Sequence, residues 1–391
     1  MSELGHFIEK TKNQTEVGWS EPEIYNLELL EDQLKLESAF RGGKIARVFD
    51  HIDEIARDLF EHNHPELRSD VKGQTEYVNS AMFRGYEYGS WVLFPWSADL
   101  VRFPNEKDYK ELRTARFREL ITENEQLELS LGRIAIFGMS VGSNLAVSLA
   151  RNGVGGAFLL GDYDSPSVSN IGRAELDMRD LGAKKIDATA KRISYINPFA
   201  EQVHMTSGFD EDSPRAVESF SPDIVGDEVD DMQISAQIRR LCAEMKVPYV
   251  TVSDVHDSVV MEICRHDLGS SPLFAGAVSD TKAEKLASGH LSKKEQESVF
   301  VKSIGYRHMT PRLINSSLEV GATLSGIPQL GSTALAAAGF ATAAYRDILL
   351  GRDIKTGVYS LKIGAKLGQK PCAKEIIQTI KRYAKYMKNR V

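Results

Sequence analysis

Residues 133–162 combine two apolar runs, a turn of small residues and a helix-like run in an order that few folds accommodate. The first apolar run spans 133–137, small residues follow at 138–143, residues 144–151 have helical spacing, and a second apolar run at 157–161 leads directly into Asp162. This order is typical of a βαβ unit, in which a helix crosses over between two parallel strands. The segment therefore predicts a parallel sheet that is covered by helices.

Short apolar runs and longer helix-like runs continue to alternate as far as residue 253. We expect a helix at 184–196, closed by Asn197-Pro198, because proline disfavours a helical residue before it. Further strands are expected at 222–226 and 249–253, with a helix at 233–245 between them. This alternation predicts an α/β fold with a doubly wound, mainly parallel, Rossmann-like sheet.

The flanking regions follow other patterns, which suggest three parts in the chain. Residues 1–107 are predicted to form a mostly helical accessory region, with helices at 23–30 and 45–59. Trp91 and Trp96 in this region are interpreted as core packing rather than as a platform for bases. Residues 108–360 would form the α/β domain, with a helix at 108–131, a less regular stretch at 268–327 that includes the capping box Ser292-x-x-Glu295, and an Ala-rich helix at 328–350. Residues 361–391 would form a basic tail helix. One face of 373–388 is predicted to be apolar, with Ile376, Ile377, Ile380, Tyr383 and Met387.

The composition of the 391-residue chain is that of a globular protein, with 42% apolar and 26% charged residues. The longest run of low polarity, 332–345, is too short to cross a bilayer, and residues 1–20 carry no secretory apolar segment. The three cysteines are far apart and form no Cys-x-x-Cys, which argues against a structural zinc or a disulfide framework. We therefore expect a cytoplasmic protein with no zinc and no membrane segment.

The net charge of −7 is unevenly distributed along the chain. Residues 362–391 contain nine lysines and arginines and a single acid, Glu375, which gives +8 and leaves −15 for the rest. An acidic body argues against general nucleic-acid binding. The basic tail keeps a local contact with an acidic partner open, including tRNA.

The turn Gly138-Met-Ser140-Val-Gly142-Ser143 is compatible with several kinds of site. Its small residues would let phosphate oxygens approach backbone N–H groups at the start of a helix. Read as Gly-x-Ser-x-Gly, it is also a candidate nucleophile elbow with Ser140 as the nucleophile, although no downstream histidine stands in a distinctive frame. Tight packing of the helix on the strand, with no ligand, accounts for the same residues. The turn alone therefore decides nothing.

Charged residues after the second strand favour a nucleotide. Asp162 follows the second glycine of the turn by 20 residues, where a carboxylate can accept protons from both ribose hydroxyls. Asp164 and Asn170 come next, and Arg173 and Lys185 supply the positive charge that could hold a triphosphate and stabilise a departing pyrophosphate. Solvated turn acids and a solvated helix start are the alternatives. We prefer a triphosphate site with chemistry at phosphorus.

Acids also follow the third predicted strand. Asp227, Asp230 and Asp231 would lie at the carboxyl end of a parallel strand, which faces the ligand crevice. Mg²⁺ favours one or two carboxylates together with phosphate oxygens. Asp230 is therefore the candidate Mg²⁺ ligand, against the alternative of an exposed acidic loop.

A set of short motifs, none of them specific alone, stands in a fixed order after the glycine turn. They are Gly153-Val-Gly155, Asp162-x-Asp164, Ser169-Asn170-x-x-Arg173, Gly182-x-x-Lys185, Ile196-Asn-Pro198, Asp227-x-x-Asp230 and Gln329-Leu-Gly-Ser332. This order resembles the ThiF/MoeB/ubiquitin-activating superfamily over roughly residues 110–351. Arg113-Thr-Ala-Arg116 and the segment 90–96 are similar to a ThiF-like subgroup that is sometimes fused to a nitroreductase-like domain.

The resemblance implies ATP- and Mg²⁺-dependent adenylation of a carboxylate, usually in a homodimer. By position, Asp162 would hold the ribose, and Asn170, Arg173 and Lys185 the phosphates. Asp230 would bind Mg²⁺, and Arg113 or Arg116 would reach the partner's site. The expected substrate is the C-terminus of a peptide or a ubiquitin-like protein. Three features depart from the family: the glycine loop is one residue shorter, the zinc-binding cysteine pairs are absent, and no cysteine stands in a thioester frame.

Other functions remain open at this point. One is an ATP-dependent dehydratase acting on a tRNA base, a chemistry found in the same superfamily. A second is a non-catalytic nucleotide-sensing scaffold, suggested by the shortened turn. A third is an NAD- or FAD-dependent oxidoreductase. Cys242 is interpreted as a core residue, and Cys264 as a residue in or beside a strand.

Overall fold

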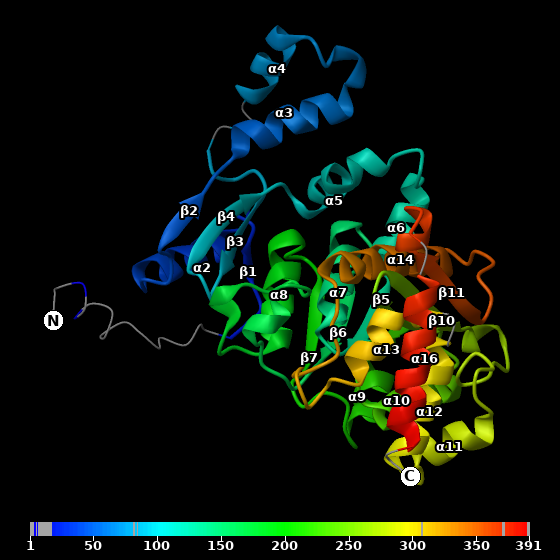
Figure 1. Cartoon of the computed structure of the whole chain (residues 1–391). Helices are drawn as coiled ribbons and strands as arrows, with labels where there is room; N and C mark the ends of the chain where they lie inside the picture. Colours follow the sequence, from blue (N-terminus) through cyan, green and yellow to red (C-terminus); the bar gives the residue numbers. More distant parts are fainter. Residues whose placement is uncertain are drawn as a thin grey trace.

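A seven-stranded sheet forms the centre of the computed structural model, which describes residues 4, 6, 18–80, 83, 85–305, 308–369 and 372–388 (Figure 1). The strand order is β11-β10-β9-β8-β5-β6-β7. The five strands of this sheet that come first in the chain, β5 to β9, pair in parallel. β10 and β11 add antiparallel strands at one edge. The strands are β5 Arg133–Phe137, β6 Ala157–Gly161, β7 Glu201–Met205, β8 Ile224–Asp227, β9 Tyr249–Val255, β10 Ser258–Cys264 and β11 Gly357–Lys362.

The strand order reverses at β5, which lies between β6 and β8. In open α/β sheets such a reversal leaves a crevice at the carboxyl ends of the two diverging strands. The predicted βαβ unit and the doubly wound, mainly parallel sheet are confirmed. The crevice beyond β5 and β8 is where a ligand is expected.

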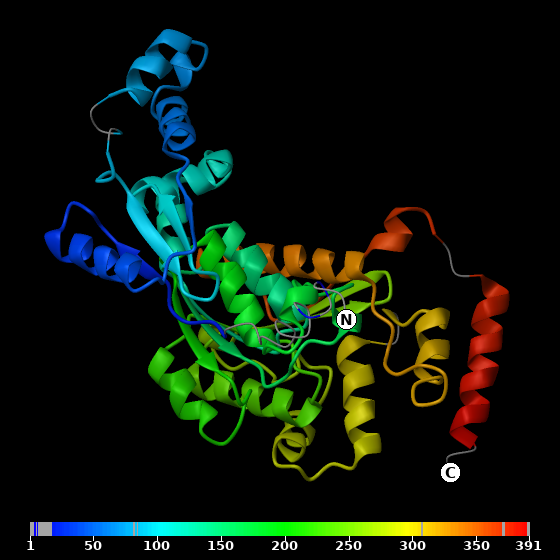
Figure 2. The same ribbon diagram turned by 90° about the vertical axis from the view of Figure 1, so that its left-hand side faces the viewer.

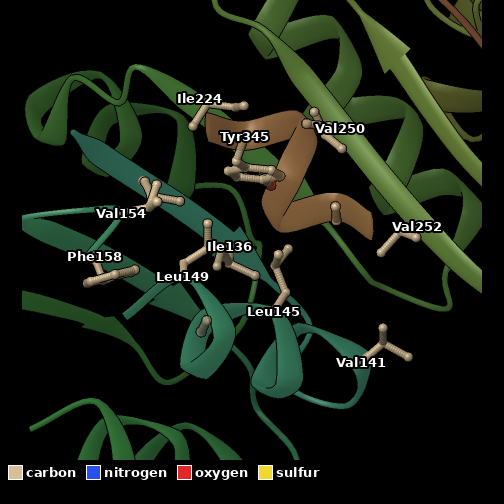
Figure 3. Packing of buried hydrophobic residues seen from close by; sticks show 14 of the residues in the cluster. Ile136, Val141, Leu145, Leu149, Val154, Phe158, Ile224, Val250, Val252 and Tyr345 are labelled. Carbon is tan, nitrogen blue, oxygen red and sulfur yellow. The ribbon is translucent and has the colours of Figure 1, made fainter. Parts of the chain in front are cut away.

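Helices cover both faces of this sheet because alternate residues of each buried strand point to opposite sides. On one face, α7 (Val141–Arg151), α8 (Lys185–Ile196) and α14 (Gly331–Leu349) pack on residues such as Ile136 and Phe158. Figure 3 shows Tyr345 of α14 and Leu145 of α7 converging beside Ile136. On the other face, α9 (Ser213–Phe220) and α10 (Met232–Met245) pack on the intervening strand residues.

From residue 18 onward, the described N-terminal region contains the helices α2 (Leu30–Arg41), α3 (Ile52–Asn63) and α4 (Val71–Val78), as well as a small sheet that the sequence did not reveal. Figure 1 shows α3 and α4 projecting away from the central sheet. The small sheet has the order β1-β3-β4-β2, with β1 Glu23–Tyr25, β2 Arg47–Phe49, β3 Ser90–Phe94 and β4 Asp99–Phe103.

The helix predicted at 23–30 was wrong, because α2 begins only at Leu30, and the helix predicted at 45–59 begins later, at Ile52 of α3. Residues 23–25 form β1, which pairs with β3, and residues 47–49 form β2, which pairs in parallel with β4. Both strands are three residues long, so the periodicity of the sequence is too short to reveal them, and their pairing overrides local helical preference. Trp91 and Trp96 are buried, 4% and 8% exposed, which confirms their prediction as core residues.

The helix predicted at 108–131 forms as two helices, α5 (Glu106–Thr114) and α6 (Glu123–Leu131), joined through the short helix η3 (Ala115–Phe117). The less regular stretch after β10 folds into α11 (Asp280–Ala287), α12 (Lys293–Ile304) and α13 (Pro311–Ser317). The capping box of Ser292 and Glu295 is present at the start of α12.

The basic tail forms the short helix α15 (Ile363–Lys366) and the predicted helix α16 (Ala373–Lys388). α16 lies against α13, where Asn315 donates a hydrogen bond to Thr379 (2.8 Å). In Figure 2, α16 lies on the side of the molecule opposite α2. Ile376, Ile377 and Ile380 are exposed, whereas the predicted face members Tyr383 and Met387 lie outside the residues whose side chains are described. Within the described helices, none has the length and apolar character that crossing a membrane requires.

The described N-terminal segment crosses the edge of the central sheet at Trp19. The Trp19 indole N–H donates to Ser194 Oγ of α8 (2.9 Å), and its ring lies 4.2 Å from the ring of His204 on β7. Burial lowers the pKa of His204 to about 4, and its buried Nε2 has no hydrogen-bond partner among the described residues. His204 is therefore a neutral side chain at physiological pH.

Acidification is expected to destabilise the protein through His204. Its pKa is about 4 when folded and close to 6.5 when unfolded, so between these values only the unfolded chain binds the proton. Above pH 6.5, the contribution of His204 to the free energy of unfolding should be constant. As the pH drops from 6.5 toward 4, this contribution should fall by up to about 1.4 kcal/mol per pH unit. Urea denaturation of His204→Phe should show a smaller difference between pH 7.5 and pH 5 than wild type. His290→Gln, which changes an exposed histidine, should show the wild-type difference, and an unchanged difference in His204→Phe would contradict this assignment.

Candidate functional site

The turn after β5 has a backbone that only glycine fits at its first position. Gly138 has φ of 87°, and a Cβ atom there would overlap the backbone of Glu228 and Val229. Gly142 lies where a Cβ would come 3.1 Å from the side chain of Ile136, so this glycine permits close packing of α7 on β5. The turn therefore combines tight packing with the N-terminus of an eleven-residue helix, where backbone N–H groups can bind an anion.

Arg173 lies directly beside this turn. Its guanidinium donates a hydrogen bond to Ser140 Oγ, and its carbonyl accepts one from Asn144 Nδ2 of α7 (2.7 Å). Gly331, the first residue of α14, packs so closely on the carbonyl of Gly172 that no Cβ would fit. The structure thus brings together the turn and the arginine, as the sequence predicted.

The nucleophile-elbow interpretation of Ser140 loses its support. The described hydrogen bond to Ser140 Oγ comes from an arginine, which is not a general base at neutral pH. The histidines that a hydrolase would need make no contact with Ser140 among the described hydrogen bonds. Ser140 is better interpreted as part of the anion-binding turn.

Asp162 is fixed at the carboxyl end of β6. It is 8% exposed, and its two carboxylate oxygens accept backbone N–H bonds from Met139 and from Asp164 (2.6 Å for the latter). Burial raises the pKa of Asp162, while these N–H groups and the Lys185 ammonium oppose the rise. Each oxygen keeps a lone pair, so the side chain can still accept hydrogen bonds from a pair of ribose hydroxyls.

Lys185 and Asp164 form an ion pair across the loop between β6 and α8. Lys185 Nζ lies 2.8 Å from Asp164 Oδ2, and the Lys185 N–H donates to the Asp164 carbonyl (3.0 Å). Lys185 is 7% exposed, while the Asp164 side chain is 49% exposed. The predicted phosphate-binding lysine is therefore held in place by the predicted nucleotide-binding acid, a pairing that spacing alone did not indicate.

Asn170 closes the short helix η4 (Val168–Asn170). Its Oδ1 accepts hydrogen bonds from the Ser167 N–H (2.9 Å) and the Ser167 hydroxyl (3.1 Å). The side-chain oxygen therefore shapes the loop that precedes Arg173, and the amide Nδ2 is the group that Asn170 could offer to a phosphate.

Carboxylates gather on the other side of the turn, at the ends of β8 and β9. Asp230 is exposed, and its carboxylate makes no hydrogen bond or ion pair within the described part of the chain. Glu228 Oε1 accepts from the Val252 N–H (3.1 Å), and Asp254 Oδ1 accepts from Gln329 Nε2 (2.8 Å). Burial, and next the charge of Asp227, raise the pKa of Glu228 well above its ordinary value; burial also raises the pKa of Asp254.

The sequence analysis missed Glu228 and Asp254. Asp254 lies at the carboxyl end of β9, so the rule that selected Asp227 and Asp230 could have found it. Within the described residues no three His, Cys, Asp or Glu side chains converge as a metal site. A single free carboxylate such as Asp230 nevertheless fits Mg²⁺, which takes its other ligands from phosphates and water.

Arg113 and Arg116 lie away from this crevice within one chain. The Arg113 guanidinium donates to the Ala150 carbonyl at the far end of α7, about 15 Å along the helix from the glycine turn. Burial lowers the pKa of Arg113, whose side chain lies over the Tyr109 ring and lines a cavity of about 220 Å³ below the amino ends of the strands. Arg116 is exposed on η3. Their predicted approach to a partner's site remains a prediction.

Cys242 and Cys264 offer no accessible nucleophile at the crevice. Cys242 is 1% exposed and Cys264 is fully buried in the core on the α9 and α10 side of the sheet, as predicted for Cys242. Burial raises the pKa of Cys264 to about 12 and that of Cys242 well above its ordinary value. Thiolate chemistry is therefore disfavoured at both.

Most of the α/β domain matches a known protein family. The ThiF family matches residues 112–344. An uncharacterized protein, MT1398, of Mycobacterium tuberculosis (strain CDC 1551 / Oshkosh) is 29% identical over 71% of this chain and 38% of its own. Molybdopterin-synthase adenylyltransferase of Haemophilus influenzae is 32% identical over 39% of this chain and 62% of its own. tRNA threonylcarbamoyladenosine dehydratase of Escherichia coli is 32% identical over 30% and 44%. The chain thus spans less than two thirds of the length of each of these relatives.

Proposed function

Because the chain belongs to the ThiF family, we propose that it adenylates a carboxylate at the expense of ATP. The observation that carries the proposal is the juxtaposition of Arg173 with the glycine turn at the start of α7, between the ribose-binding candidate Asp162 and the free carboxylate of Asp230. A helix N-terminus with an arginine beside it suits a triphosphate better than the uncharged turn of a dinucleotide site does.

In this proposal, ATP lies across the crevice with its ribose on Asp162 and its phosphates on the turn. The N–H groups of the first turn of α7, Arg173 and the Asn170 amide would hold phosphate oxygens, and Lys185 would add a fourth contact while it remains paired with Asp164. The shortened turn keeps this capacity, because Arg173 already lies beside Ser140.

The reaction joins a substrate carboxylate to the α-phosphate and releases pyrophosphate. The carboxylate oxygen forms a bond to the α-phosphorus as the bond to the bridging oxygen of the pyrophosphate breaks, so no proton must be removed. Arg173 and Lys185 would stabilise the charge that develops on the leaving group, and catalysis depends on positioning and electrostatics. Asp230 would hold Mg²⁺, which offsets phosphate charge when bound.

The substrate in this proposal is the C-terminus of a peptide or a ubiquitin-like protein. The N-terminal region and residues 268–327 would bind it, in a cytoplasmic homodimer in which Arg113 or Arg116 reaches the partner's crevice. A second candidate is dehydration of a tRNA base, supported by the similarity to the Escherichia coli dehydratase and by the basic helix α16. Deleting residues 362–391 and measuring salt-dependent tRNA binding would separate the two.

Exchange of labelled pyrophosphate into ATP tests the proposal. Wild type should exchange pyrophosphate in the presence of Mg²⁺ and a suitable peptide carboxylate, and calorimetry should show saturable binding of ATP but not of NAD. Tight ATP binding without exchange for any carboxylate would favour the nucleotide-sensing scaffold. Binding of NAD in preference to ATP would overturn the assignment.

A further inference from the structure

Beneath the loop that carries Asp230, a set of buried hydrogen bonds holds Asp227. One carboxylate oxygen of Asp227 accepts from both the Tyr249 hydroxyl (2.7 Å) and the Ser235 hydroxyl (2.6 Å). The other oxygen accepts from the backbone N–H of Val229 (3.1 Å). Asp227 is 2% exposed, so it cannot itself touch a ligand in the crevice, but it fixes the backbone immediately before Asp230.

The two hydroxyl donors are themselves held by a buried ion pair. Arg239 of α10 donates to Glu262 of β10 (2.6 Å) and to the Leu273 carbonyl (2.9 Å). Its guanidinium lies 4.2 Å from the centre of the Tyr249 ring and 4.1 Å from that of Phe274. Arg239 and Glu262 are 2% and 3% exposed, so the ion pair is buried. Because the guanidinium packs on the Tyr249 ring, the ring and its hydroxyl are held in place.

The loop that carries Asp230 is also held at Asp231, where it enters α10, and at Glu228, where it contacts the glycine turn. Asp231 accepts from the N–H groups of Gln233 (2.8 Å) and Ile234 (3.1 Å) and so caps α10. Gly138 of the phosphate turn packs on the Glu228 backbone with no room for a Cβ. Asp230 is thus an exposed residue of a loop that is fixed on both sides and is in contact with the phosphate turn.

We infer that Tyr249 and Ser235 are positioning residues for the divalent cation that accompanies ATP. They act through Asp227 and the Val229 N–H, which set the direction in which Asp230 faces the phosphates. This inference rests on the proposed function. Interactions beyond the direct ligands of a metal typically change its affinity by 10- to 100-fold when removed.

The chain supplies a matched control in Tyr345. Its hydroxyl is buried on the opposite face of β8, approaches Gly226 closely and has no hydrogen-bond partner in the part of the chain that the structure describes. Tyr249 and Tyr345 are both fully buried tyrosines, so replacing either by phenylalanine removes one buried oxygen beside the same strand. Only Tyr249→Phe removes a hydrogen bond to Asp227.

The test uses the full chain with ATP and Mn²⁺, with free Mn²⁺ measured by electron paramagnetic resonance. Tyr249→Phe should raise the dissociation constant of Mn²⁺ about 10-fold, while the ATP affinity measured in EDTA stays within about twofold of wild type. Ser235→Ala should produce a similar shift and serves if Tyr249→Phe does not fold. Tyr345→Phe should bind Mn²⁺ as wild type does.

Equal Mn²⁺ affinity in Tyr249→Phe and wild type, or the same loss in Tyr345→Phe, would overturn the inference. The result is separable from the proposed function, because Mn²⁺ binding is measured without a carboxylate substrate. A wild-type chain that binds ATP with Mn²⁺ but exchanges no pyrophosphate would overturn the proposed function, and a Tyr249-specific loss of Mn²⁺ affinity would then still support the positioning role.

Discussion

Asp230→Ala is expected to lower pyrophosphate exchange by about 10²- to 10³-fold, the scale on which one preorganised electrostatic contact contributes to catalysis. Its carboxylate is the free acid of the loop after β8, with no hydrogen bond or ion pair among the described residues, so its removal exposes no buried partner. The fold should therefore survive, and the loss should appear in the reaction rather than in expression or melting temperature.

Asp212→Ala is the matched control for this substitution. Asp212 is also an exposed acid just after a strand and its turn, and its side chain makes no capping hydrogen bond to α9. It should exchange pyrophosphate at the wild-type rate. An equal loss in both variants would point to a general effect of surface charge, and wild-type exchange in Asp230→Ala would remove Asp230 from the proposed site.

Glu262→Ala is expected to destabilise the fold by about 3–5 kcal/mol, because it leaves the Arg239 guanidinium buried without its carboxylate. Counting side-chain atoms alone, Arg239 and Glu262 are 3% and 4% exposed, and Arg239 Nη1 lies 2.6 Å from Glu262 Oε1. The pKa of Arg239 is raised even though burial opposes it, because the Glu262 carboxylate and other anionic groups favour the charged form. Arginine cannot shed its proton at usable pH, so the lost interaction appears as lost stability.

Urea denaturation of Glu262→Ala and Glu201→Ala measures this difference. Glu201 pairs with Arg133 at 3.1 Å, but both side chains are substantially exposed, 54% and 35%. Breaking such a surface pair costs at most about 1 kcal/mol. Similar midpoints for the two variants would show that the protein compensates for the buried charge by structural change or by water entry.

The inner parallel strands of the central sheet could be predicted from the sequence because they are buried on both faces. The strands expected at 133–137, 157–161, 222–226 and 249–253 differ from the observed bounds of β5, β6, β8 and β9 by at most two residues. β7, β10 and β11 were not predicted, and β7 and β11 are only partly buried and carry no continuous apolar run. β1 and β2 could not be predicted, because three residues carry no usable periodicity and their conformation depends on pairing with β3 and β4.

The position of Asp162 beside the glycine turn could be predicted because it follows from its place at the end of a strand, and Arg173 also lies beside the turn as predicted. Side-chain pairing was not predictable. The ion pair of Lys185 with Asp164 depends on how the loop folds back, and the contact of Arg113 with the end of α7 depends on where α5 packs. Such contacts depend on tertiary structure, and the spacing of residues in the sequence does not predict them.

The contact between Gly331 and the carbonyl of Gly172 has a mechanical consequence. The segment that enters α14 leads back to the stretch proposed to bind the substrate, and Gly172 is the neighbour of Arg173. Since the two backbones touch with no intervening side chain, neither can shift toward the other without displacing it. A substrate bound to residues 268–327 that draws the α14 entry segment inward would push on Arg173, so its binding would be communicated to the proposed phosphate site by direct steric contact.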